Sequence, residues 1–157
     1  MLLRKIMLTV FIGLLSGCSL IGLGGDDPSE LRLTIKPSPE INPNFLGEAS
    51  PVVIRLYELS SNTEFNSASF MSLLSNDKSA LGNSMLTKKT LPSLIPNETV
   101  KYDIILNDKT LYLGVFIEFA DFNNSIPKGI VSIKPFEKND IILNVNRMSM
   151  TLDREDD

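Results

Sequence analysis

One cysteine and the complete absence of histidine restrict the chemistry that this 157-residue chain can offer. Without histidine, neither a Ser/His/Asp nor a Cys/His arrangement can form, and the commonest protein ligand for metals is missing. The carboxylate pairs Asp26-Asp27 and Asp156-Asp157 lie near the two ends of the chain. At those positions we expect no pocket that would separate the pKa values of two carboxyl groups. The sequence therefore predicts no enzyme, no catalytic residue, no metal site and no cofactor.

The cysteine, Cys18, follows an apolar stretch near the N-terminus. Arg4 and Lys5 precede an uncharged run from Ile6 to Leu15, which is the order of a secretory signal peptide. The run is too short to cross a bilayer, because a membrane-spanning helix needs about 20 apolar residues. The sequence Leu15-Ser16-Gly17-Cys18 resembles a bacterial lipobox. That resemblance implies cleavage after residue 17 and covalent lipid on the Cys18 thiol; the alternative is a small apolar residue within an ordinary signal peptide.

The lipid would decide where the protein resides. Two or three acyl chains hold a protein on a membrane, whereas a single chain gives only weak, reversible attachment. Ser19 stands where inner-membrane lipoproteins often carry Asp, so the sorting rule of enteric bacteria predicts the periplasmic face of the outer membrane. Residues 18–29 are rich in Gly and Asp and are expected to form a flexible tether. Apolar residues that could enter the membrane interface from this tether are Leu20, Ile21 and Leu23.

Composition predicts one acidic domain. The chain has 15 Lys+Arg and 19 Asp+Glu, and removing residues 1–17 takes away Arg4 and Lys5, which leaves 13 against 19 and a formal charge of −6. No basic cluster exceeds Lys88-Lys89, so nucleic acid is not an expected partner. With 43% hydrophobic residues the mature chain can build its own core. We assign this domain to residues 30–152, followed by a solvated acidic tail at 153–157.

Apolar and polar residues alternate through most of this domain, as in half-buried strands. At the end of the chain the alternation changes parity after Val145, which predicts a β-bulge near Asn146-Arg147. Strands joined by short turns, all expected to be antiparallel, predict an all-β fold, a two-sheet antiparallel β-sandwich. The predicted strands are 31–35, 52–59, 85–90, 100–106, 110–121, 130–134 and 141–152.

One segment departs from the two-residue period. Phe70, Leu73 and Leu74 recur at helical spacing. We expect one short added helix that begins near Asn66 or Ser67 as N-cap and packs its apolar face on the sandwich. A further helical turn is expected around 79–81, closed by Gly82.

Three sequence stretches resemble the TssJ family of type VI secretion lipoproteins. They are the segment Asn42-Pro43-Asn44-x-x-Gly47-x-x-Ser50-Pro51-Val52-Val53-Ile54-Arg55-Leu56-Tyr57-Glu58-Leu59, the segment Phe65-x-x-Ala68-Ser69-Phe70-x-x-Leu73, and Leu81-Gly82. The chain departs from the family pattern at Ser69, where an acidic residue is usual. The resemblance implies a transthyretin-like β-sandwich with an added helix, anchored in the outer membrane. It also implies a partner, the periplasmic C-terminal domain of the inner-membrane protein TssM.

The loop at residues 37–51 is the best candidate for partner contact. It contains four prolines and one glycine and is much longer than a tight hairpin requires. Restricted backbone freedom reduces the entropy that such a loop loses on binding. The resemblance assigns TssM binding to this loop, although Phe45 and Leu46 could instead fold back onto the sandwich. The predicted partner-binding residues are Ile41, Asn42, Pro43, Asn44, Phe45, Leu46 and Gly47.

A second functional hypothesis is an outer-membrane lipoprotein whose sandwich binds a small ligand, a sugar or peptidoglycan. Sugar sites usually present aromatic rings for stacking. The chain contains no Trp and three Tyr, so its surface is poorly equipped for this role.

Overall fold

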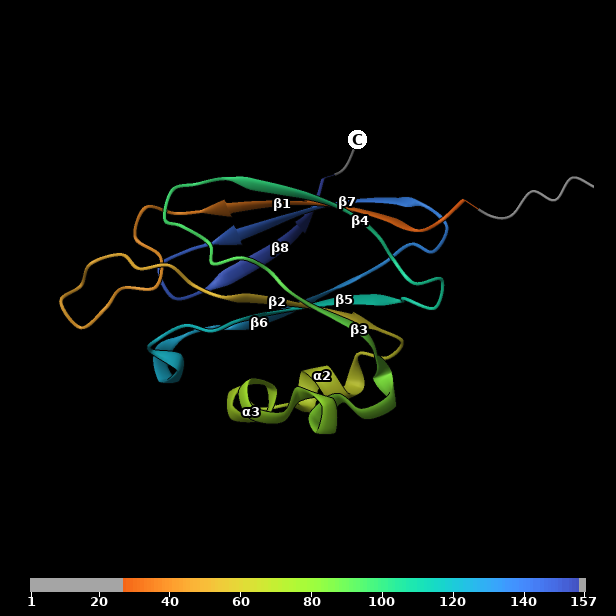
Figure 1. Cartoon of the computed structure of the whole chain (residues 1–157), viewed down its shortest axis with the longest axis horizontal. Helices are drawn as coiled ribbons and strands as arrows, with labels where there is room; N and C mark the ends of the chain where they lie inside the picture. Colours follow the sequence, from red (N-terminus) through yellow and green to blue (C-terminus); the bar gives the residue numbers. More distant parts are fainter. Residues whose placement is uncertain (1–26, 156–157) are drawn as a thin grey trace, which may run out of the picture.

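The computed structural model describes residues 27–155, so the predicted signal peptide, Cys18 and most of the predicted tether lie outside the described residues. Two four-stranded sheets pack face to face, and two helices cover the outer face of the second sheet (Figure 1). The strands are β1 (Glu30–Pro37), β2 (Ile54–Leu59), β3 (Met85–Thr90), β4 (Val100–Ile105), β5 (Tyr112–Ile117), β6 (Lys128–Ser132), β7 (Lys138–Val145) and β8 (Met150–Arg154). The helices are α2 (Thr63–Ser67) and α3 (Phe70–Leu81), with single 3₁₀ turns η1 (Gly82–Ser84) and η2 (Phe122–Asn124).

The predicted two-sheet β-sandwich is confirmed. The first sheet has the order β4-β1-β7-β8 and the second the order β3-β2-β5-β6. Leu33 and Ile35 of β1 point into the core, where they meet Leu56 of β2 and Val115 of β5. The alternation seen in the sequence thus reflects two sheets that each bury one face.

Three details of the strand prediction were wrong. Strand β1 pairs antiparallel with β4 but parallel with β7, so the strands are not all antiparallel. Alternating burial is the same beside a parallel or an antiparallel neighbour, and the sequence pattern therefore did not distinguish them. The parity change after Val145 is not a bulge but a hairpin turn between β7 and β8. In this turn the Asn146 N–H donates to the Ser149 carbonyl at 2.8 Å. Strand β8 also includes Asp153 and Arg154, so the predicted acidic tail began too early.

The domain also begins earlier than predicted. Ser29, assigned to the tether, is fully buried. Its carbonyl accepts from the Leu106 N–H at 2.9 Å, and its hydroxyl oxygen accepts from the Phe136 N–H at 2.8 Å. The chain is therefore fixed to the sandwich from this residue onward.

The added helical segment is present as two helices. Asn66 and Ser67 lie inside α2, and Ser69 is the N-cap of α3, where its side chain accepts from the Ser72 N–H at 3.1 Å. Helix α3 is interrupted at Asn76, and its second half ends at Gly82, whose φ of +53° suits glycine. This second half is the expected turn at residues 79–81.

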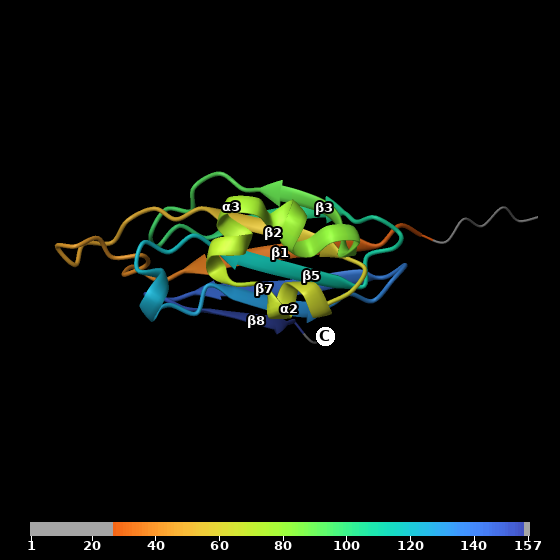
Figure 2. The ribbon, with the colours of Figure 1, turned by 90° about the horizontal axis from the view of Figure 1, so that it is seen from below.

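The helices bury a second apolar cluster on the outer face of the second sheet. Figure 2 shows both helices in front of the second sheet, with α3 beside β2 and α2 beside β5. Tyr57 and Phe116 point outward from these strands and are covered by Phe65 of α2 and by Leu73 of α3. Among residues 27–155, neither helix is long and apolar enough to cross a membrane.

Candidate partner-binding surface

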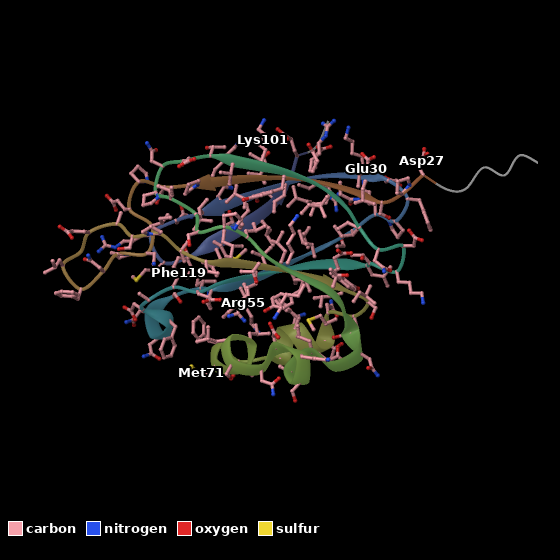
Figure 3. The ribbon with its side chains drawn as sticks, in the orientation of Figure 1. Asp27, Glu30, Arg55, Met71, Lys101 and Phe119 are labelled. Carbon is pink, nitrogen blue, oxygen red and sulfur yellow. The ribbon has the colours of Figure 1, made fainter. Side chains whose placement is uncertain are left out.

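The loop between β1 and β2 projects from one end of the sandwich. Figure 1 shows it at the end opposite to the one where the N-terminal segment enters, and Figure 3 places Asp27 and Glu30 at the entry end. The base of the loop is tied to the sandwich. The Asn42 N–H donates to the Arg147 carbonyl at 2.8 Å, and the Ser50 N–H donates to the Ile41 carbonyl at 3.1 Å. The loop thus closes as a narrow finger above a fixed base.

Asn42 links this loop to the loop between β5 and β6. Its side-chain amide donates to the Pro51 carbonyl at 2.9 Å, and its side-chain oxygen accepts from the Ala120 N–H at 2.7 Å. The residue is buried and has a φ of +46°, a conformation that asparagine tolerates better than most residues. One side chain therefore fixes the relative position of two loops.

Asn44 organises the tip of the loop. Its side-chain oxygen accepts from the N–H groups of Leu46 at 2.9 Å and Glu48 at 3.0 Å. Its carbonyl accepts from the N–H of Gly47, which has a φ of +81° that favours glycine. These bonds hold the tip in one turn, so residues 45 and 46 are presented on an ordered backbone.

Phe45 and Leu46 point into solvent. Their exposed fractions are 95% and 67%, so the alternative in which they fold back onto the sandwich is wrong. Ile41, in contrast, is fully buried in the main core. Its predicted role as a partner contact is corrected: Ile41 and the buried Asn42 support the loop from beneath.

A cleft of about 560 Å³ lies beside the tip of the loop. The loop between β5 and β6 and the turn between β7 and β8 both contribute to it. Phe122 and Ile126, also between β5 and β6, are exposed. Sequence reasoning missed these contributions, because they come from segments far apart in the chain. The lining residues are Pro43, Asn44, Phe45, Gly47, Ala120, Asp121, Arg147 and Met148.

Charged and polar side chains also gather in a cluster beneath α3. The Arg55 guanidinium donates to Glu118 at 2.6 Å and to the carbonyls of Leu73 at 3.1 Å and Leu74 at 3.3 Å. These carbonyls precede the interruption of α3 at Asn76, where regular helical hydrogen bonding stops. Arg55 therefore caps the first half of the helix.

Asp77 completes this cluster. One carboxylate oxygen accepts from the Tyr57 hydroxyl at 3.0 Å and from the Lys88 ammonium at 2.9 Å. Burial, and then the hydrogen bond to Asp77, raises the pKa of Tyr57 above its ordinary value. Burial alone would raise the pKa of Asp77, but the hydrogen bonds from Lys88 and Tyr57 outweigh it and hold that pKa below its ordinary value. Both groups thus stay in the protonation states that join helix and sheet.

The described residues contain no candidate metal site. No group of three or more candidate metal-ligating side chains occurs within residues 27–155. The buried polar atoms of the cluster beneath α3 all have hydrogen-bond partners, and the cluster connects α3 to the second sheet. The loop between β1 and β2, in contrast, presents apolar side chains to solvent. The loop between β1 and β2 is therefore the candidate functional site.

Solved structures with the same fold come from type VI secretion. The lipoprotein TssJ1 from Pseudomonas aeruginosa aligns with a TM-score of 0.78 and 22% identity, over 83% of this chain and 98% of that chain. The membrane-bound component Lip from Serratia marcescens aligns with a TM-score of 0.74 and 24% identity, over 83% of this chain and 99% of that chain. A chain of a type VI membrane complex aligns with a TM-score of 0.69 and 25% identity, over 80% of this chain and 98% of that chain.

Sequence comparison gives the family. No curated protein matches the chain. The family model for type VI secretion lipoproteins, described by the names VasD, EvfM and TssJ, matches residues 29–148. This match covers most of the chain, including the loop between β1 and β2 and the polar cluster beneath α3. The chain therefore belongs to the type VI secretion lipoprotein family that includes TssJ.

Proposed function

We propose that this protein anchors a type VI secretion membrane complex to the outer membrane by binding the periplasmic C-terminal domain of TssM. The proposal assigns no catalysis to the chain. Covalent lipid on Cys18 holds the protein on the periplasmic face of the membrane, and the β-sandwich presents the binding loop. Membership of the type VI secretion lipoprotein family and the similarity to a chain of a type VI membrane complex support this role.

The exposed pair Phe45 and Leu46 is the observation that carries the partner assignment. An ordered loop loses little backbone entropy on binding, and the large apolar side chains at its tip gain by leaving water. Asn44 and Gly47 hold the turn that presents them. The neighbouring cleft, lined in part by Ala120 and Met148, widens the surface that a partner domain can cover.

The test compares two double variants of the full-length lipoprotein, purified in detergent. Phe45→Ser with Leu46→Ser removes the apolar tip of the loop. Phe136→Ser with Leu111→Ser makes the same chemical change at exposed residues near the opposite end. In calorimetry against the periplasmic C-terminal domain of TssM, we expect the loop variant to bind at least about tenfold more weakly. The control variant should bind as the wild type does, and unchanged affinity of the loop variant would remove the proposal.

The lipid assignment has a separate test. Mass spectrometry of the protein isolated from cells should show a chain that begins at Cys18 and carries acyl groups. The variant Cys18→Ser should leave the membrane fraction. An unmodified residue 18 in membrane-bound protein would contradict the proposed anchor.

A further inference from the structure

Exposed apolar side chains also gather at the end of the sandwich where the chain enters from its N-terminal segment. Ile105, Leu111 and Phe136 are 63%, 44% and 45% exposed. Ile105 ends β4 and lies opposite Glu30 at the start of β1. The loops at residues 106–111 and 133–137 lie at this same end in Figures 1 and 2. These side chains are thus far from the candidate partner-binding loop.

Phe136 is held in its exposed position by a braced loop. Its N–H donates to the hydroxyl oxygen of Ser29 at 2.8 Å. Asn139 is fully buried and spans the loop: its side-chain oxygen accepts from the Lys134 N–H at 2.8 Å, and its amide donates to the carbonyls of Lys134 at 3.0 Å and Glu137 at 3.1 Å. Because the loop is fixed from inside, Phe136 is kept in solvent by the fold itself.

We propose that this entry end of the sandwich rests on the bilayer, with Ile105, Leu111 and Phe136 in the boundary between lipid headgroups and acyl chains. The proposal rests on the lipid anchor at Cys18 in the proposed function. Isolated apolar side chains at the end of a membrane-tethered domain gain by leaving water for this boundary, as the apolar faces of interfacial helices do.

The length of the N-terminal segment argues for the bilayer as the occupant of this surface. Only the residues from Cys18 to Pro28 separate the proposed lipid from Ser29, the first residue fixed to the sandwich. Even fully extended, such a segment spans at most about 40 Å. The domain therefore stays close to the membrane, and the end nearest to the anchor is the one that carries the three apolar side chains.

Electrostatic attraction does not drive this contact. Exposed charged residues at this end are the cations Lys109, Lys134 and Lys138 and the anions Asp27, Glu30, Asp108 and Glu137. The cationic groups do not outnumber the anionic ones, so attraction to anionic headgroups is not the main force. The contact is therefore expected to depend on the apolar side chains and to persist at high salt.

The contact would orient the domain. Strand β1 runs from the entry end toward the partner-binding loop, and its eight residues span about 26 Å. With the entry end on the bilayer, Phe45 and Leu46 point away from the membrane, toward the periplasm. A partner that comes from the inner membrane would then meet the loop without a reorientation of the domain.

The test places one fluorescent reporter at either end of the lipidated, full-length protein. Since the Cys18 thiol carries lipid, Glu137→Cys and Glu48→Cys each supply a single labelling site, at an exposed glutamate in each case. The labelled proteins are reconstituted into phosphatidylethanolamine–phosphatidylglycerol vesicles that contain a lipid quencher near the headgroups. We expect quenching at residue 137 to be about threefold stronger than at residue 48. Adding Leu111→Ser and Phe136→Ser to Glu137→Cys should lower the quenching to the level seen at residue 48.

Each outcome decides the inference. Equal quenching at residues 137 and 48, or quenching at 137 that survives the serine substitutions, overturns it. Failure of the protein to float with vesicles overturns the lipid anchor and this inference together. Strong quenching at residue 137 in a protein that does not bind TssM supports this inference and removes only the proposed partner.

Discussion

The Tyr57 hydroxyl lies 3.0 Å from a carboxylate oxygen of Asp77, to which it donates a hydrogen bond that joins β2 to α3. Both side chains are buried. The bond lies where α3 is interrupted at Asn76, so it fixes the second half of the helix on the sheet. Arg55 and Tyr57, both part of the family resemblance, thus supply structural contacts with α3.

Replacing Tyr57 by Phe should cost a small, measurable part of the stability. The ring still packs against Phe65, while Asp77 keeps the Lys88 ammonium as a donor. The loss is therefore close to that of one hydrogen bond, and we expect the free energy of unfolding to fall by about 1 kcal/mol. Chemical denaturation measures this change, and Tyr102→Phe at a half-buried position on β4 is the control. Equal losses for the two variants would contradict the assigned role.

The variant Asp77→Asn should change how stability depends on pH. Because the folded-state pKa of Asp77 lies below its ordinary value of 3.8, this carboxylate stabilises the fold above that pH. The contribution is lost as the pH falls through the folded-state pKa. At neutral pH we expect the variant to lose about 2 kcal/mol of the free energy of unfolding.

The measurement is denaturation of both proteins between neutral and acid pH. The difference between wild type and Asp77→Asn should shrink below pH 3.8. Asp103→Asn is the matched control, since the Asp103 side chain is 89% exposed. A difference that stays constant across the acid range would show that Asp77 does not act through its charge.

Strand positions followed from the sequence because each sheet buries one face. Leu31, Leu33 and Ile35 of β1 are all buried, as their alternation predicted. The relation between strands did not follow, because β7 carries the same alternation whichever way it runs beside β1. A parity change likewise identifies a break in the pattern, and only the hydrogen bond between Asn146 and Ser149 identifies the break as a turn.

The candidate partner-binding loop was selected from the sequence by its length and prolines, and its binding role stays a prediction. Phe45 and Leu46 are exposed, as expected of an apolar tip. Ile41 was misassigned, because an apolar residue at the base of a loop has the same composition signal as one at the tip. Ala120 and Met148 reach the surface only in the folded chain, where Asn42 bonds to the Ala120 N–H and to the Arg147 carbonyl next to Met148.

Two glycines should differ in their tolerance of a methyl group. A Cβ on Gly114 of β5 would lie 3.0 Å from side-chain atoms of both Leu59 and Phe65. These side chains are buried between the helices and the second sheet, so we expect Gly114→Ala to lower the free energy of unfolding by about 1–3 kcal/mol. A Cβ on Gly129 would lie 2.8 Å from the terminal methyl group of Met150, which can move. Thermal denaturation should therefore show a smaller loss for Gly129→Ala.

The last prediction concerns the coupling between loops. Asn42→Ala leaves the apolar tip of the loop intact but removes the acceptor for the Ala120 N–H and the donor to the Pro51 carbonyl. Because both backbone groups lose a partner, we expect the free energy of unfolding to fall by about 1–3 kcal/mol. Binding of the TssM domain should also weaken, since the tip and the neighbouring loop no longer keep one relative position.

Calorimetry at a temperature where the variant stays folded separates this positioning effect from unfolding. Glu48→Ala is the control, because its side chain accepts from the Asn44 amide at an exposed site and leaves the bonds of Asn42 unchanged. Lower affinity for Asn42→Ala, with more entropy lost on binding than in the wild type, would show that the loop is held ready by Asn42. Wild-type affinity in a folded Asn42→Ala variant would mean that the tip binds without help from the loop between β5 and β6.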